Sequence, residues 1–261
     1  HIDYLHFPLS VRSATPHVTT LHGRLDISDL QELYGVFPDV PVISISDSQR
    51  SPLSWLRWQG TVYHGLPEDL FTPSFRKGSY LAFLGRVSAE KRLDRAIEIA
   101  CAAGIPLKIA AKIDLADREY FEEKIKGLLD HPLVEFIGEI GEEEKEKFLG
   151  DAIALLFPID WSEPFGLVMI ESMACGTPVI AYENGSVPEI VGHGRSGFIV
   201  NDQAGAIEAV RNIETLDRRE CRKAFEERFT SAHMADAYIR VYHELMQQQQ
   251  QNRFDLKILQ S

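Results

Sequence analysis

The stretch SEPFGLVMIESMACGTPVIAYENGSVPE, from Ser162 to Glu189, decides how the rest of the chain is organised. A short apolar run, residues 153–158, precedes it, and a second run, residues 179–182, lies inside it; both have the length and branched side chains of strands. Between them Gly166 opens a predicted helix, and Gly176, two residues before a proline, ends it. The pattern predicts strand, loop, helix and strand. In parallel sheets ligands bind beyond the carboxyl ends of such strands, where helix N-termini attract anions.

Two carboxylates, Glu163 and Glu171, frame this predicted turn with seven residues between them. Spacing alone is explained equally well by a solvated loop acid and a surface helix acid. The wider pattern decides the question, because E-P-F-G-L-x-x-x-E is followed by A-C-G-T-P-V-I-A and by N-G-S-V-P-E-I-V. Together these motifs resemble the donor-binding signature of the retaining family-4 glycosyltransferases, which have the GT-B fold.

A second element, G-R-V-S-A-E-K, places Arg86 and Lys91 between a predicted strand, residues 80–84, and a predicted helix, residues 93–103. Two cations at the carboxyl end of a strand could neutralise a diphosphate and stabilise it as a leaving group. Taken alone, they would be explained more simply as surface side chains. They match the G-R-x-x-x-x-K element of the same family, and the resemblance therefore assigns both to the donor phosphates.

The resemblance implies roles for the remaining candidates. Glu163 would bind the hydroxyls of the donor sugar and Glu171 those of the ribose, so the two are not a glycosidase acid and base. Backbone groups of Phe165, Gly166 and Leu167 would hold phosphate or sugar, and Gly138 and Ile140 would form the loop that contacts the nucleobase.

His22, in T-L-H-G, occupies a place where family members carry a polar residue that faces the donor sugar. A hydrogen-bonded histidine at a strand end explains it equally well. The expected catalytic set is therefore His22, Glu163, Arg86 and Lys91. The expected chemistry is front-face displacement, in which the leaving phosphate acts as the base.

Strands alternate with helices from residue 80 onward, which predicts a parallel sheet covered on both faces. The expected fold class is α/β of GT-B type, with a complete C-terminal Rossmann-like domain and a truncated N-terminal one. We divide the chain into an N-terminal remnant (1–65), a proline- and glycine-rich linker (66–79), a donor-binding domain (80–230), and a final helix and tail (231–261) that pack toward the first domain. We expect that helix to end near residue 246, before a glutamine run that frays.

The further elements expected from periodicity and turn residues are strands at residues 16–21, 41–46, 60–63, 107–111, 134–137 and 197–200. Helices are expected at residues 28–37, 47–58 (interrupted by Pro52), 117–129, 142–150, 204–213, 216–229 and 232–246. About sixty residues precede the linker, roughly half of a usual domain of this size. We therefore expect the glycine-rich loop of the family's first domain to be absent.

Composition narrows the function classes. The chain has 261 residues, 44% of them hydrophobic, and a formal net charge of −12, which argues against nucleic acid or an anionic membrane as a partner. Its three cysteines are widely spaced, as in reduced thiols of a cytosolic protein. No apolar run approaches the ~20 residues that span a bilayer, and no stretch has the basic start and apolar centre expected of a signal peptide. The sequence predicts a cytoplasmic protein.

No cofactor and no metal are expected. Residues 192–197 satisfy G-x-G-x-x-G, but they lead into a strand, the reverse of the dinucleotide-binding context. No pair of aspartates separated by one residue is present, so a metal-held diphosphate has no support.

The expected function is transfer of a sugar from a UDP- or GDP-linked donor to a hydroxyl acceptor, either a saccharide, a lipid or a small molecule, with retention of configuration. A nucleotide-sugar epimerase or a phosphorylase on the same fold is the alternative. A third hypothesis is a donor-binding fragment with little turnover, which self-associates or requires the missing N-terminal segment.

Overall fold

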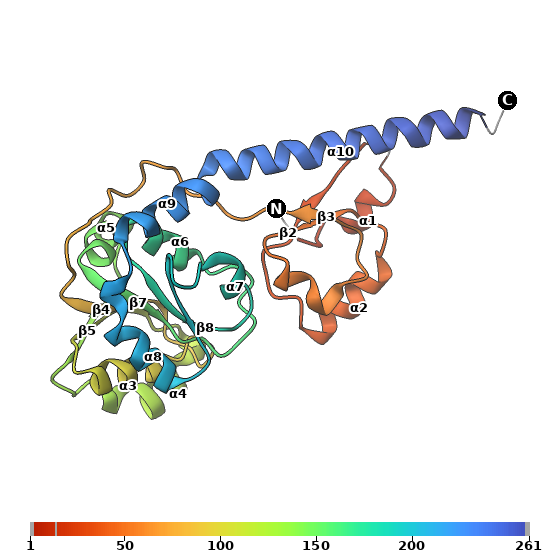
Figure 1. Ribbon diagram of the computed structural model, residues 1–261. Helices are drawn as coiled ribbons and strands as arrows, with labels where there is room; N and C mark the ends of the chain where they lie inside the picture. Colours follow the sequence, from red (N-terminus) through yellow and green to blue (C-terminus); the bar gives the residue numbers. More distant parts are fainter. Residues whose placement is uncertain (1–2, 14, 259–261) are drawn as a thin grey trace.

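The computed structural model describes residues 3–13 and 15–258, with side chains up to residue 248. Two parallel β-sheets organise the chain (Figure 1). The larger contains six strands in the order β6-β5-β4-β7-β8-β9, and the smaller contains three in the order β1-β2-β3. The prediction of an α/β fold with parallel sheets is confirmed.

The elements of the larger domain are β4 (Tyr80–Arg86), α3 (Leu93–Ala103), β5 (Leu107–Lys112), η2 (Leu115–Asp117), α4 (Arg118–Tyr120), η3 (Phe121–Ile125), η4 (Lys126–Leu128), β6 (Val134–Gly138), α5 (Glu142–Gly150), β7 (Ala152–Phe157), α6 (Leu167–Ala174), β8 (Val179–Tyr182), α7 (Val187–Ile190), β9 (Gly197–Val200), α8 (Gln203–Arg211), η5 (Ile213–Thr215) and α9 (Arg218–Arg228). The elements of the smaller domain are α1 (Phe7–Ser10), β1 (Thr19–Thr20), α2 (Ser28–Val36), β2 (Val42–Ser44), η1 (Ser48–Leu53) and β3 (Trp58–Thr61), and the chain continues beyond α9 as α10 (Ser231–Ile258).

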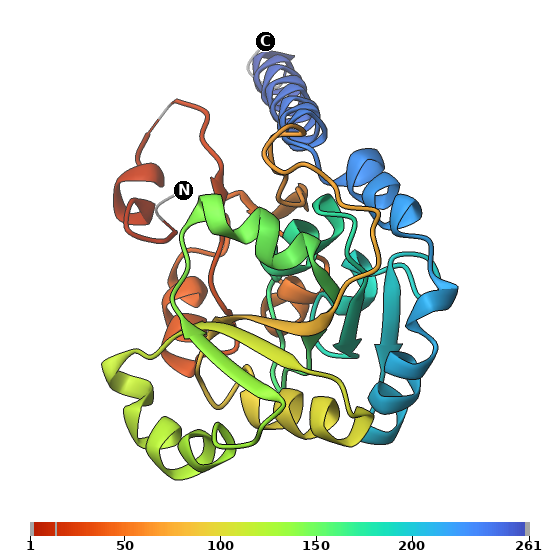
Figure 2. The same ribbon diagram turned by 90° about the vertical axis from the view of Figure 1, so that its left-hand side faces the viewer.

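The strand order of the large sheet reverses between β4 and β7. This is the doubly wound order in which neighbouring connections leave toward opposite faces, and a crevice opens at the carboxyl ends of the two central strands. Helices α3 and α8 pack against one face of the sheet and α5, α6 and α9 against the other, each over its own buried apolar cluster (Figure 2). Two buried apolar clusters, one on each face of the sheet, therefore support the strands that form the crevice.

Four predicted elements differ from the structure. The helix expected over residues 47–58 is the 3₁₀ turn η1, because Pro52 has no N–H to donate to a longer helix. The helix expected over residues 117–129 is a succession of short 3₁₀, α and π turns, in which Ile125 is buried. The strand expected over residues 16–21 pairs only at Thr19–Thr20. The last helix does not end near residue 246 but continues through the glutamine run to Ile258.

Residues 66–79, expected to be a linker, lie against the large domain. The Arg218 guanidinium donates to the carbonyls of Ser74 at 2.8 Å, Ala152 at 2.7 Å and Gly150 at 2.8 Å. Arg222 donates to the carbonyls of Phe71 and Glu68 at 3.0 and 2.7 Å. Two guanidinium groups thus satisfy backbone carbonyls that the extended segment could not pair by itself.

Helix α10 lies along the small domain, as Figure 1 shows. Val241 packs with Ile43 and Val62 in a small buried cluster. The hydroxyls of Tyr238 and Thr20 are 2.9 Å apart. The chain therefore returns to its first domain after completing the second.

Glu189, in the first turn of α7, joins the two domains. Its carboxylate accepts the backbone N–H groups of Asp47 and Ser48, both at 2.7 Å, and the hydroxyl of Tyr63 at 3.1 Å. Burial and, to a smaller extent, the charge of Glu189 raise the pKa of Tyr63 to about 12, so that the phenol keeps its proton and remains a hydrogen-bond donor. One carboxylate thus fixes the start of η1 against the large domain.

We expect Glu189→Ala to loosen this junction. Hydrogen bonds to a charged group contribute about 1.5–3 kcal/mol each, and every 1.4 kcal/mol is a factor of ten. Amide hydrogen exchange at Asp47 and Ser48 should accelerate more than tenfold, whereas exchange in β4 and β7 should not change. Glu183→Ala is the control, because Glu183 is an exposed carboxylate that directly follows β8. Unchanged exchange at both amides in Glu189→Ala would contradict this role.

Candidate functional site

The candidate site lies at the crevice where the strand order reverses. Arg86 is the last residue of β4. Glu163 lies in the loop that connects β7 to α6. The carboxyl ends of β5 and β6 lie on the same edge, because all six strands are parallel. The topology therefore brings segments from four strands to one place.

Lys91 and Glu163 form an ion pair across this crevice, linking the loop after β4 to the loop after β7. The Lys91 ammonium lies 5.3 Å from the ring centres of both Phe157 and Trp161. Glu163 is 8% exposed. Burial strengthens the attraction between the charges, and the pair nevertheless keeps an edge in solvent that a ligand could reach.

The Glu163 loop is held by a close approach of backbone to backbone. Gly185 has a φ of +57°, and a Cβ there would lie 2.3 Å from the Glu163 nitrogen. Ser186 donates its N–H to the Glu163 carbonyl at 3.0 Å and its hydroxyl to the Phe165 carbonyl at 2.8 Å. Only glycine fits at position 185, and the turn after β8 thereby fixes the loop after β7.

Gly166 makes the turn into α6. Its φ is +78°, and a Cβ there would lie 2.7 Å from the Met169 methyl and 3.2 Å from the Phe157 ring. The residue therefore supplies both a left-handed conformation and a lack of bulk. Phe165 is buried, whereas the side chain of Leu167 points into solvent, 45% exposed.

Glu171 and Ile140 line one cavity of about 230 Å³ with the carboxyl ends of β4 and β5. Glu171 is 9% exposed and accepts a hydrogen bond from Lys145 at 2.8 Å. Lys145 lies 3.1 Å from Glu142 as well. Burial lowers the pKa of Lys145, but the two carboxylates outweigh it and the net shift is upward. The cavity thus contains a fixed carboxylate beside a charged lysine and apolar walls.

Gly138 lies at the end of β6 with a φ of +80° and turns the chain toward this cavity. Ile140 follows two residues later and is partly buried against the same core as α6. The structure therefore places the predicted nucleobase loop next to Glu171.

Arg86 is half exposed and surrounded by acids. Its guanidinium lies 3.7 Å from Glu90, 3.9 Å from Asp114 and 3.8 Å from Asp117. These distances exceed ordinary hydrogen bonds, so the side chain is held loosely by charge alone. An incoming anion would have to replace these partners.

His22 lies in the small domain, and its backbone N–H donates to Asp3 at 3.2 Å. Its ring stacks on that of His64 with 5.3 Å between the centres. The His64 ring then meets Phe165 edge-on at 4.9 Å. The two histidines thus connect the small domain to the Glu163 loop.

Sequence reasoning missed three residues at the site. His64 and Lys145 gave no signal, because each contacts residues far away in the sequence. Trp161 could have been found as an aromatic side chain in a loop at a strand end; it lies 5.3 Å from Arg24 as well as from Lys91. Five buried side-chain atoms of the described residues have no hydrogen-bond partner, and two of them, Trp161 Nε1 and Ser88 Oγ, belong to the loops at this crevice.

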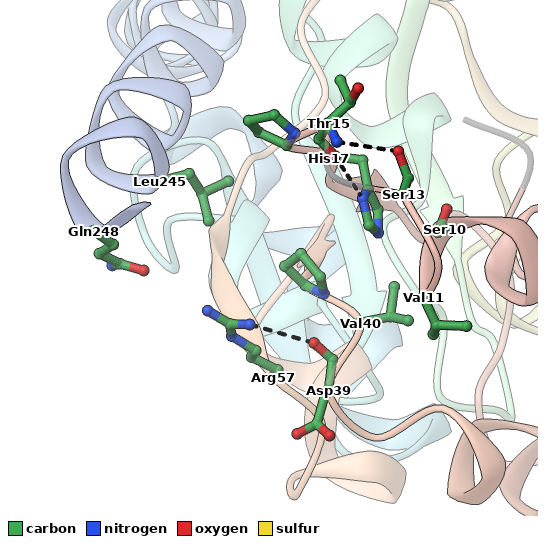
Figure 3. Close-up of a pocket in the computed structure, with 12 residues that line it drawn as sticks. Ser10, Val11, Ser13, Thr15, His17, Asp39, Val40, Arg57, Leu245 and Gln248 are labelled. Atoms are coloured by element: carbon green, nitrogen blue, oxygen red, sulfur yellow. Dashed lines mark hydrogen bonds between the residues drawn. The ribbon is translucent and has the colours of Figure 1, made fainter. Parts of the chain in front are cut away.

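A cavity of about 370 Å³ lies elsewhere, in the small domain and against α10. It is lined by His17, Arg57 and Asp39 among others, and Arg57 donates to the Asp39 carbonyl at 3.4 Å (Figure 3). These residues precede the small-sheet strands, so the cavity lies at the end of that sheet opposite to His22.

The described part of the chain contains no cluster of three or more His, Cys, Asp or Glu side chains that could hold a metal ion. It also contains no helix long and apolar enough to cross a membrane.

We expect Gly185→Ala to destabilise the fold by at least about 2 kcal/mol, through strain and through collision with the Glu163 backbone. Gly194→Ala is the matched control, since Gly194 has a φ of +76° but nothing within 4 Å of an added Cβ. Urea unfolding measures both variants. Equal losses of free energy would show that the close approach at Gly185 has no energetic consequence.

Stability should also fall with acid through His64. Burial lowers the pKa of His64 to about 4, below its ordinary value of 6.5. Between these values the unfolded chain binds more protons, so this contribution is complete above pH 6.5 and is lost as the pH falls toward 4. His64→Gln should flatten the stability profile in that window. His243→Gln, at an exposed position on α10, should leave it unchanged; a profile of equal slope in His64→Gln would refute the assignment.

Comparison with known proteins gives the family. Residues 70–230, more than half of the chain, match the model of the glycosyl transferases group 1. The chain is 27% identical to the D-inositol 3-phosphate glycosyltransferase of Mycolicibacterium smegmatis over 234 residues, which are 78% of this chain and 50% of that protein. The chain spans about half the length of the curated relatives it matches.

Solved structures agree. AviGT4, a glycosyltransferase involved in avilamycin A biosynthesis, is 26% identical with a TM-score of 0.68, covering 78% of this chain and 63% of that one. Anabaena HepE in complex with UDP has a TM-score of 0.77 at 19% identity, covering 90% of this chain and 74% of that one, and shares the fold. The architecture is that of GT-B, and the chain belongs to the glycosyl transferases group 1.

Proposed function

We propose that this chain binds a nucleotide-sugar donor at the carboxyl edge of the large sheet and contributes to retaining transfer of the sugar to a hydroxyl acceptor. The observation that carries the proposal is the arrangement on either side of the start of α6. A cavity with the Glu171 carboxylate lies on one side, and the Lys91–Glu163 pair lies on the other.

Each part of this arrangement suits one part of the donor. The apolar wall near Ile140 suits the base, and Glu171, held by Lys145, can accept hydrogen bonds from ribose hydroxyls. The diphosphate would then extend toward the N–H groups at the start of α6, where the helix dipole favours negative charge. Lys91 and Arg86 come from the facing strand end and would stabilise the charge that grows on the leaving phosphate.

Glu163 would receive the sugar. Lys91 binds one of its oxygens, which leaves acceptor capacity for sugar hydroxyls. His22 faces this loop through His64 and Phe165. In front-face displacement the leaving phosphate takes the acceptor proton, and the role of the protein is to position donor and acceptor and to offset charge. HepE shares only the fold, so both UDP- and GDP-linked donors stay candidates.

Nucleotide binding tests the first step. We expect Glu171→Gln and Lys91→Met each to weaken UDP or GDP binding at least tenfold in calorimetry, because each removes a charged partner that contributes about 1.5–3 kcal/mol. Glu143→Gln and Lys147→Met, both at exposed positions on α5, are the matched controls. Nucleotide affinity equal to that of the wild type in both Glu171→Gln and Lys91→Met would contradict the proposal.

Product analysis tests the second step. Incubation with UDP-glucose and with GDP-mannose, with and without a hydroxylated acceptor, should release nucleoside diphosphate only when acceptor is present. The product should keep the anomeric configuration of the donor by proton NMR. An isomerised donor would instead identify an epimerase.

A further inference from the structure

A small polar cavity opens between the two domains, directly beside the Glu163 loop. Its volume is about 80 Å³, and its lining includes Arg24, Asp26, Ser48 and Ser51 from the small domain and Ser162 and Pro164 from the large one. Glu163 lies between the last two residues. The cavity therefore adjoins the place where the donor sugar is proposed to lie, on the side of the small domain.

The single cation in the lining of this cavity is already engaged. Arg24 donates to both oxygens of Asp26 at 2.7 and 2.8 Å and to Glu90 at 3.0 Å, and its guanidinium lies 5.3 Å from the Trp161 ring. The hydrogen bond between them raises the pKa of Arg24 and lowers that of Asp26, so both groups stay charged. Arg24 is thus shared by two carboxylates.

A further carboxylate lies close by, since Glu189 accepts the N–H of Ser48 at 2.7 Å. In and around this lining four carboxylates, Asp26, Glu90, Glu163 and Glu189, face three cations, Arg24, Arg86 and Lys91, so the balance of charge is negative. A phosphate group brought into this cavity would meet repulsion that Arg24 has no spare charge to offset. A hydroxyl group meets no such barrier, because it both donates and accepts.

The lining also offers hydrogen bonds of both kinds. The hydroxyls of Ser48, Ser51 and Ser162 can donate or accept, and the Asp26 carboxylate keeps free lone pairs beside its bonds to Arg24. The volume suits one edge of a sugar or polyol ring rather than a whole ring.

We propose that this cavity is an acceptor subsite that takes an uncharged sugar or polyol and discriminates against a phosphorylated one. The inference rests on the proposed donor site. The inference adds the class of acceptor to the proposed function. It attributes the discrimination against phosphate to the negative charges of Asp26 and Glu90, which together exceed the positive charge of Arg24.

Ligand-observed NMR on the chain saturated with UDP tests it, with methyl α-D-glucopyranoside and glucose 6-phosphate as probes. The uncharged glucoside should bind at least tenfold more tightly than the phosphate. Asp26→Asn should narrow that ratio at least threefold, since one negative charge is removed. Asp29→Asn, at an exposed acid three residues away, should preserve it.

A second variant does not depend on the Arg24–Asp26 pair. Ser51→Tyr fills the cavity from an exposed position and should abolish glucoside binding, with UDP affinity within twofold of wild type and an unchanged melting temperature. Equal or tighter binding of glucose 6-phosphate, an unchanged ratio in Asp26→Asn, or no glucoside binding to the UDP complex would each overturn the subsite. Failure of the wild type to bind UDP or GDP at all would instead overturn the donor site on which it rests.

Discussion

The Lys91–Glu163 ion pair connects the two sides of the crevice that the strand order creates. Lys91 follows the first strand of the large sheet, β4, and Glu163 follows its neighbour β7, so the pair joins the two connections that diverge there. Each partner is held by other parts of the fold: Lys91 between the Phe157 and Trp161 rings, and the Glu163 backbone by Gly185. The candidate site depends on this arrangement, because both halves of the proposed donor site are built outward from it.

The small domain reaches this crevice through three separate contacts. Glu189 accepts two backbone N–H groups at the start of η1, His64 connects His22 with Phe165, and Arg24 reaches Glu90 and Trp161. All three contacts end near the Glu163 loop or on the turn that follows β8. A movement of the small domain would therefore displace the residues at the sugar end of the site before it displaced Glu171.

The sequence predicted well those features that depend on local pattern. The strand–loop–helix–strand unit appears as β7, α6 and β8, the GT-B fold is confirmed, and the family resemblance is confirmed at the level of the glycosyl transferases group 1. The family resemblance assigned Glu171 and Ile140 to neighbouring parts of the donor, and in the structure both line one cavity. Lys145, His64 and the cavity near Arg24 could not, since they depend on contacts between segments far apart in the chain. The same holds for η1 and for the broken helix near Ile125, where a proline and tertiary packing override helical periodicity.

In the proposed function the nucleotide binds at the carboxyl edge of the large sheet and not in the larger cavity near His17. Backbone amide shift mapping by NMR on titration with UDP or GDP tests this most directly. The largest changes in amide chemical shift should occur at Gly138–Ile140, at Gly166–Glu171 and at Gly85–Lys91, with little change at Ser10–Ser13 and Arg57. Shifts concentrated around His17 and Arg57, with the sheet edge unaffected, would contradict this placement of the nucleotide.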